Sequence, residues 1–194
     1  VIMNEAELYL SKNIQYTELV NGLQKALDFY GNKVTGKLLK QRSSLHLNDK
    51  TSYGNKKLGC FYPISYCIEL FQVKDMIANK SVDVVFVHEL AHFIDRINVS
   101  GHSRYKYASS IRGSKERIVA ECFRNYMFPF PQKRTNYRGR TCELFARAIE
   151  EYYAISVDSS YMLNHFIGWD YYVDIEKFRK NVLPIVKAYI TNLL

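Results

Sequence analysis

The chain has 194 residues, 47% of them hydrophobic, so it is long enough to bury one core and too short to promise two. No apolar run approaches the roughly 20 residues that cross a bilayer, and residues 1–30 lack a signal-peptide pattern. The four cysteines, at positions 60, 67, 122 and 142, form no C-x-x-C pair, which favours buried thiols over disulfides. We expect a cytoplasmic protein without a membrane segment, while secretion by another route stays open.

The formal net charge is +8 because 27 Lys and Arg residues outnumber 19 Asp and Glu residues. The basic residues gather at 33–42 and at 133–140. We interpret both segments as solvated loops, since no nucleic-acid-binding motif accompanies them. Attraction of acidic partners, including nucleic acid, stays open.

Residues 1–57 are expected to form one helix followed by loops. Apolar residues from Leu19 to Tyr30 recur at helical spacing, with Thr17 placed to cap the helix and Gly31 to end it. The segment 32–57 is irregular and rich in Gly, Ser, Asn and Lys. It predicts a loop with a strand fragment at 45–47.

One strand is predicted within residues 58–71. Its alternate positions are apolar, namely Ile64, Tyr66, Ile68 and Leu70. This is the period of a half-buried strand. Because Pro63 cannot donate to a ladder, the segment is either an edge strand or a hairpin bent at that point.

The rest of the chain is predicted to be mostly helical. A helix that starts at 79–81 and includes 84–95 is apolar nearly all round, which indicates a central, buried position. Residues 98–114 are polar and predict a surface excursion. Further helices are expected at 115–126, at 142–155 after a Thr141 cap, and at the C-terminus, where Asp174 is a cap and Pro184 divides the helix.

The central helix carries the sequence His88-Glu89-Leu90-Ala91-His92. Two histidines four residues apart project from one helix face, so both imidazoles can reach one metal ion at about 2 Å. Glu89 would then stand beside the metal, where it can take a proton from a bound water. The spacing therefore indicates a zinc peptidase site. A chance match is the alternative, but burying these groups in an apolar helix without a ligand would be costly.

A catalytic zinc site normally has three protein ligands and one open position. The metzincin continuation fails because the chain has Asp95 and Asn98 where Gly and His are required. Four other residues stay possible as the third ligand, namely His102, His165, Glu116 and Glu121. Glu143 is the better candidate, because it opens a helix whose small and apolar residues would allow a close approach.

These motifs together resemble the zincin-like domains of phage and mobile-element polyvalent proteins. The resemblance rests on the segment from His88 to Asp95 and on Tyr137-x5-Glu143-Leu144-Phe145-Ala146-Arg147-Ala148. The resemblance covers about residues 58–155. The same motifs are similar, more distantly, to toxin metallopeptidases of the lethal-factor type. The chain departs from the pattern at Ala91, where members often have Gly, and at 141–142, where they often have Pro.

The resemblance implies that His88, His92 and Glu143 bind Zn²⁺, that Glu89 is the base, and that Tyr137 donates its hydroxyl to the oxyanion. A packing role for Tyr137 is the alternative, since the chain has 16 tyrosines. Asp95 follows the histidines by seven and three residues on the same helix face. It would orient a ligand imidazole, or else form a surface salt bridge with an arginine.

We therefore predict an α+β, zincin-like fold with a small, mostly antiparallel sheet, an edge strand beside the central helix, and further helices at both termini. One domain would contain N-terminal helix and loops (1–57), a catalytic core (58–155) and a C-terminal helical segment (156–194). The expected function is zinc-dependent hydrolysis of a protein or peptide substrate, with a glutamate as third ligand. The basic residues at 133–140 suggest an acidic substrate. The alternative is a zinc-binding interaction or nucleic-acid-associated module of a mobile element, with weak or vestigial peptidase activity.

Overall fold

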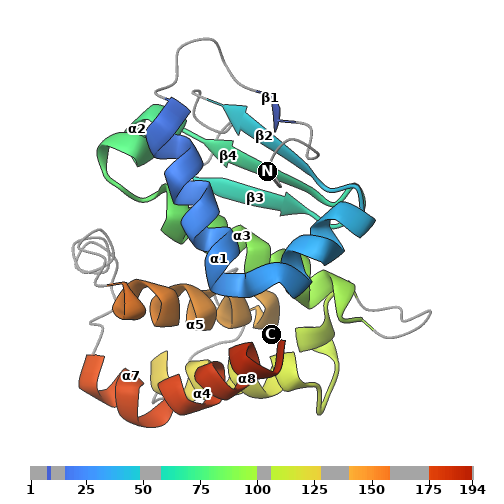
Figure 1. Ribbon diagram of the computed structural model, residues 1–194. Helices are drawn as coiled ribbons and strands as arrows, with labels where there is room; N and C mark the ends of the chain where they lie inside the picture. Colours follow the sequence, from blue (N-terminus) through green and yellow to red (C-terminus); the bar gives the residue numbers. More distant parts are fainter. Residues whose placement is uncertain are drawn as a thin grey trace. The chain divides into compact units, whose positions relative to one another are not determined.

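The computed structural model describes residues 8–9, 16–48, 58–99, 106–127, 140–157 and 175–193. The fold is α+β and mostly helical, with a small mixed sheet (Figure 1). The chain divides into two compact units, Val1–Phe93 with Leu193–Leu194, and Ile94–Asn192. Each unit is described by itself below.

The sheet of the first unit has the strand order β1-β2-β4-β3, with β1 at Leu8–Tyr9, β2 at Ser44–Asn48, β3 at Gly59–Tyr62 and β4 at Cys67–Phe71. β1 and β2 are parallel, β2 and β4 are parallel, and only β3 and β4 are antiparallel. The prediction of a mostly antiparallel sheet is therefore wrong. The long helix α1 (Tyr16–Lys40) connects β1 to β2 and supplies the crossover that these two parallel neighbours need.

The segment 58–71 is a hairpin, the second of the two predicted alternatives. β3 lies at the edge of the sheet and β4 is paired on both sides. Ile68 and Leu70 are buried as expected. Ile64, however, is 89% exposed, because it belongs to the turn rather than to a strand. Tyr66, with φ of 52°, lies in the same turn, so the period-two pattern overestimates the length of the strand.

Helix α1 bends at Gly31, where φ is 70° and the backbone is not helical (Figure 1). Gly31 therefore ends the first helical segment as predicted, since glycine adopts this conformation without steric cost. The chain then becomes helical again up to Lys40, so the loop predicted from residue 32 is wrong over this stretch. Val34 and Thr35 are buried there, and that burial holds a polar, basic segment in a helix. β2 confirms the strand fragment predicted at 45–47.

Helix α3 (Val82–Ile97) confirms the predicted central helix, and its residues Val84, Val87, Leu90 and Ala91 are fully buried. The buried hydroxyl of Tyr30 in α1 donates a 2.8 Å hydrogen bond to the carbonyl oxygen of Val87. A short helix, α2 (Val73–Ala78), precedes α3 and was not predicted. With six residues it is too short to show helical periodicity.

The second unit contains η2 (Ala108–Ser110), α4 (Lys115–Met127), α5 (Thr141–Ser156), α7 (Ile175–Asn181) and α8 (Leu183–Leu193). α4 contacts α5, η2 and α7. The predicted helices at 115–126 and 142–155 are confirmed, and the C-terminal helix is divided next to Pro184 as expected. Thr141 is the first residue of α5 and not its cap, which is Arg140. Asp174 lies outside the described residues. The surface excursion predicted at 98–114 is wrong at η2, because Ala108 and Ser109 are buried. Residues 100–105 lie outside the described residues.

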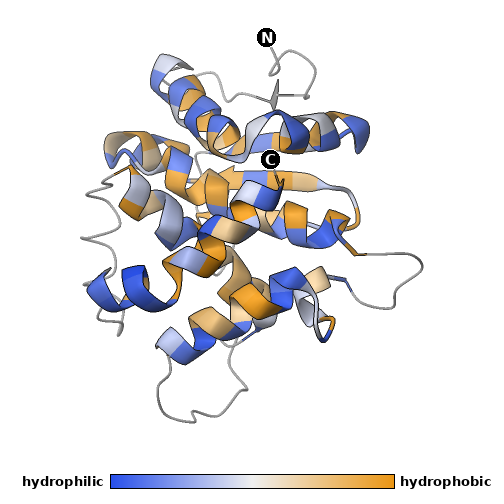
Figure 2. Cartoon of the chain, turned by 60° about the horizontal axis from the view of Figure 1, so that its bottom comes forward, coloured by the Kyte–Doolittle hydropathy of each residue, from blue (hydrophilic) through white to orange (hydrophobic). Residues whose placement is uncertain are grey.

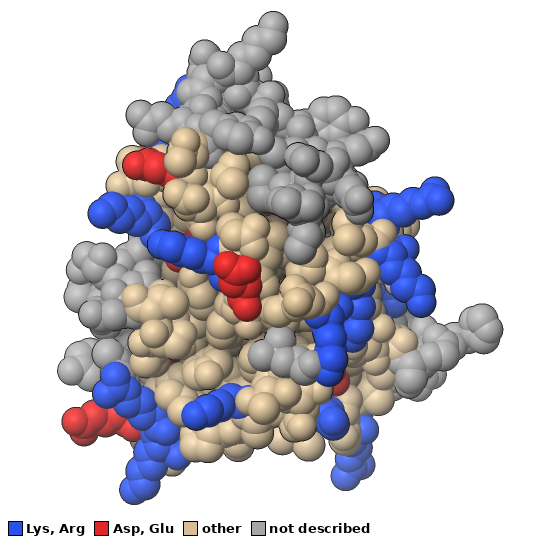
Figure 3. All heavy atoms as spheres, in the orientation of Figure 1, with Lys and Arg blue, Asp and Glu red and all other residues tan. Residues whose placement is uncertain are grey.

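The distribution of hydrophobic and charged residues agrees with the amphipathic helices and the positive net charge expected from the sequence. The helices carry hydrophobic residues on one side and hydrophilic residues on the other (Figure 2), and Lys and Arg are more common than Asp and Glu on the face drawn in Figure 3. All four cysteines are free thiols, as predicted, but only Cys67 is buried and the other three are half-buried. Among the described helices, none combines the length and the hydrophobicity that a membrane span requires.

Candidate metal centre

His88 and His92 occupy successive turns of α3 and project from the same face. Their ring centroids are 4.9 Å apart, and the ring planes are inclined by 78°. His92 is 6% exposed, and His88 is half-buried. The helix places them so because an offset of four residues is slightly more than one turn.

Glu143 joins this pair. It lies in the first turn of α5 and is 4% exposed. One ligand atom from each of His88, His92 and Glu143 can be chosen so that all three lie within 4.8 Å of one another. The structure thus brings together the three residues that the sequence singled out as ligands. A carboxylate in the first turn of a helix is also favourably placed, because the free N–H groups there attract negative charge.

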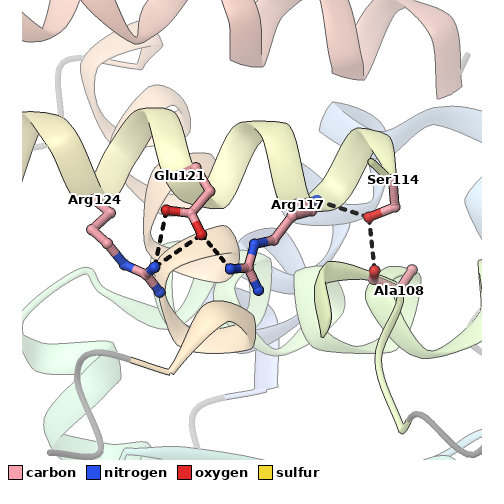
Figure 4. A network of polar contacts seen from close by, with 5 residues as sticks. All are labelled: Ala108, Ser114, Arg117, Glu121 and Arg124. Carbon is pink, nitrogen blue, oxygen red and sulfur yellow. Dashed lines mark hydrogen bonds and ion pairs between the residues drawn. The ribbon is translucent and has the colours of Figure 1, made fainter. Parts of the chain in front are cut away.

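The other carboxylates considered as third ligand have different partners. Oε1 of Glu116 accepts hydrogen bonds from the hydroxyl of Tyr189 and from Nδ2 of Asn98, each at 2.9 Å. Glu121 forms ion pairs with Arg117 and Arg124 along α4 (Figure 4). Two glutamates are thereby engaged within their own unit, and neither belongs to the His88, His92 and Glu143 group. His102 and His165 lie outside the described residues.

The donor set suits zinc. Two imidazoles and one carboxylate are ligands that zinc accepts, and three protein ligands leave one position of a tetrahedron open. Bonds of about 2.0–2.2 Å at tetrahedral angles would bring the ligand atoms to about 3.4 Å from one another. The ligand atoms lie within 4.8 Å of one another, which is somewhat wider than this spacing. The residues therefore fit the metal that the H-E-x-x-H spacing predicts.

Glu89 lies between the two histidines in the sequence and is 5% exposed. Its side chain lies directly against Gly59, the first residue of β3. A Cβ atom placed on Gly59 would stand 2.6 Å from Oε1 of Glu89 and 2.7 Å from its Cγ. The carboxylate therefore occupies space that only a glycine at this point of the strand leaves open.

Asp95 is fully buried three residues after His92. Its Oδ1 accepts a 2.7 Å hydrogen bond from the backbone N–H of Ser109, and its Oδ2 accepts a 2.6 Å hydrogen bond from the hydroxyl of the same residue. Burial raises the pKa of Asp95 to about 7, against the opposing effect of these two hydrogen bonds. The alternative of a surface salt bridge is wrong because the carboxylate is not at the surface. Orientation of an imidazole by Asp95 stays a prediction.

The contacts of Gly59 with Glu89 and of Ser109 with Asp95 were not predicted from the sequence. A glycine at the start of a strand is not unusual, and a serine in a polar segment favours the interpretation as a loop. Their roles depend on contacts with α3 that are remote in the sequence. Only the pairing of β3 with β4 and the packing of η2 reveal them.

Tyr137, predicted as an oxyanion donor, lies outside the described residues, as do residues 133–139 of the basic segment. The other predicted basic segment, at 33–42, is mainly the second half of α1 and not a loop. No family model matches the chain, and no curated protein or solved structure matches it either.

Proposed function

We propose that this protein is a zinc-dependent peptidase in which His88, His92 and Glu143 hold the metal and Glu89 acts as the base. One observation carries the proposal. The ligand atoms of His88 and His92 in α3, the helix that also carries Glu89, lie close to a ligand atom of Glu143 in α5. Two of the three ligands, His92 and Glu143, are buried. Two imidazoles and a carboxylate are ligands that zinc accepts, and three such protein ligands leave one position open for the water that hydrolysis requires.

The chemistry follows from the positions of the chain's own residues. Zinc, when bound, would polarise the peptide carbonyl and lower the pKa of a coordinated water to about 7. Glu89 would take a proton from the attacking water and deliver it to the leaving amine. Its low exposure favours this role, because few competing water molecules reach the carboxylate.

The substrate would be a peptide in extended form. β3 lies at one edge of the sheet, β1 at the other, and a strand edge can pair with a further strand through main-chain hydrogen bonds. Glu89 lies against Gly59 at the first residue of that strand. A peptide paired with β3 would therefore pass close to the base. The net charge of +8 supports a preference for acidic substrates.

The test is the substitution Glu89→Gln, with Glu18→Gln in the exposed first turn of α1 as the matched control. We expect the wild-type protein to bind one zinc ion and to cleave peptides from a mixed peptide library. Glu89→Gln should retain the zinc and lose at least about 100-fold in kcat, the size of a general-base contribution. Glu18→Gln should change neither. Absence of stoichiometric zinc in the wild-type protein would refute the proposal.

A further inference from the structure

The side chain of Glu89 lies so close to Gly59 that it leaves no room for a side chain at position 59. Three atoms of Glu89, namely Cγ, Cδ and Oε1, lie within 3.0 Å of the point where a Cβ on Gly59 would stand. The glutamate side chain thus lies along the backbone of β3. Observed Cβ atoms essentially never show contacts below 3.0 Å, so a side chain at 59 and Glu89 in its present place exclude each other.

If residue 59 carried a side chain, the side chain of Glu89 would be the group that moves. The three atoms nearest to that Cβ position all belong to the side chain of Glu89, and none of them is a backbone atom. Gly59 does not have the positive φ that makes Gly31 and Gly113 dependent on glycine. Alanine is therefore compatible with the backbone at 59. A methyl group there would displace the carboxylate and leave the hairpin intact.

We propose that Gly59 is a positioning residue that sets the place of the Glu89 carboxylate, and through it the rate of the proposed hydrolysis. The inference rests on the proposed function for its kinetic part only, because the contact itself involves two residues of the first unit and no metal. Its physical basis is that proton transfer requires the base within about 2.6–3.2 Å of the proton it takes, so a small displacement of the base has a large effect on rate.

The main experiment compares Gly59→Ala with Gly36→Ala. Gly36 is the matched control, since a Cβ at that position of α1 meets no atom within 4 Å and its φ is not positive. We expect Gly59→Ala to lower kcat by about 100-fold, with little change in KM or zinc content. Gly36→Ala should keep the kcat of the wild type. An equal kcat for all three proteins would overturn the inference.

A double-mutant cycle tests whether Gly59 acts through Glu89. Glu89→Ala removes Cγ, Cδ and Oε1, the three atoms that the new methyl group would meet. We expect Gly59→Ala to reduce kcat at least about 10-fold less in the Glu89→Ala background than in the wild type. An equal reduction in both backgrounds would mean that the methyl group acts elsewhere, for example on the pairing of β3 with substrate, and the inference would fail.

A further readout needs neither zinc nor activity. In metal-free protein with ¹³C-labelled glutamate, the carboxyl signal of Glu89 can be identified by its loss in Glu89→Gln. We expect this signal to move in Gly59→Ala and to stay in place in Gly36→Ala. A Glu89 signal that Gly59→Ala leaves in place would overturn the positioning role. If the signal moves while the wild-type protein hydrolyses no peptide, the contact is upheld and the proposed peptidase function alone fails.

Discussion

Ser109 holds both carboxylate oxygens of Asp95, one through its backbone N–H at 2.7 Å and the other through its hydroxyl at 2.6 Å. Both residues are completely buried, and the contact joins the last turns of α3 to η2. The substitution Ser109→Ala should therefore lower the free energy of unfolding by about 1–3 kcal/mol, because it leaves a buried carboxyl oxygen without its hydroxyl donor. Urea unfolding of the metal-free protein measures this loss.

The neighbouring residue provides the control. Ser110 is half-buried, and its backbone N–H donates to the carbonyl oxygen of Tyr107, a bond that alanine would keep. Ser110→Ala should change the free energy of unfolding by less than about 0.5 kcal/mol. If both variants unfold at the same urea concentration, the hydrogen bond from the Ser109 hydroxyl contributes nothing to the fold.

Glu151 in α5 should make stability depend on pH. It is 1% exposed, and the hydroxyl of Tyr126 donates to its Oε1 at 3.1 Å. Burial raises the pKa of Glu151 to about 8, with Glu150 adding to the effect and with Tyr126 and Arg147 opposing it. The folded state thus favours the protonated acid. The resulting stabilisation is complete below the ordinary pKa of 4.5 and is lost as the pH rises through about 8.

Replacing Glu151 by Gln should remove this dependence. We expect the free energy of unfolding of the wild-type protein to fall by on the order of 2 kcal/mol between about pH 5 and about pH 8, and that of Glu151→Gln to fall by clearly less. Chemical unfolding at a series of pH values measures both slopes. Glu176→Gln, at an exposed position of α7, should keep the wild-type slope. Parallel curves for wild type and Glu151→Gln would contradict the raised pKa.

The sequence predicted the elements whose signal is local. α3, α4 and α5 were found because their apolar residues recur at helical spacing, and β2 was found from only three alternating residues. The second half of α1 was missed, since its helix depends on the burial of Val34 and Thr35 within a polar segment. The parallel pairing of β2 with β4 was also missed. Strand order depends on which chain segments meet in space, and no local pattern encodes it.

The same distinction holds for the candidate site. His88, Glu89 and His92 were identified because one helical turn places them together. Glu143 was identified by elimination and by resemblance, from the composition of its helix, and its ligand atom lies with those of the two histidines. The contact of Glu89 with Gly59 and the hydrogen bonds from Ser109 to Asp95 were not predicted. They arise from tertiary packing, which periodicity does not report.

The third ligand is tested by comparing two glutamates. Glu143→Gln should lower the affinity for zinc by more than about 100-fold, because even the loss of a residue that only orients a ligand costs about 10–100-fold. Glu121→Gln should leave the affinity unchanged, since Glu121 pairs with Arg117 and Arg124 and lies outside the ligand group. Competition with a chelator of known affinity measures both constants at one pH. If Glu143→Gln binds zinc as tightly as the wild type, a different residue completes the site, and His102 and His165 become the next ligands to replace.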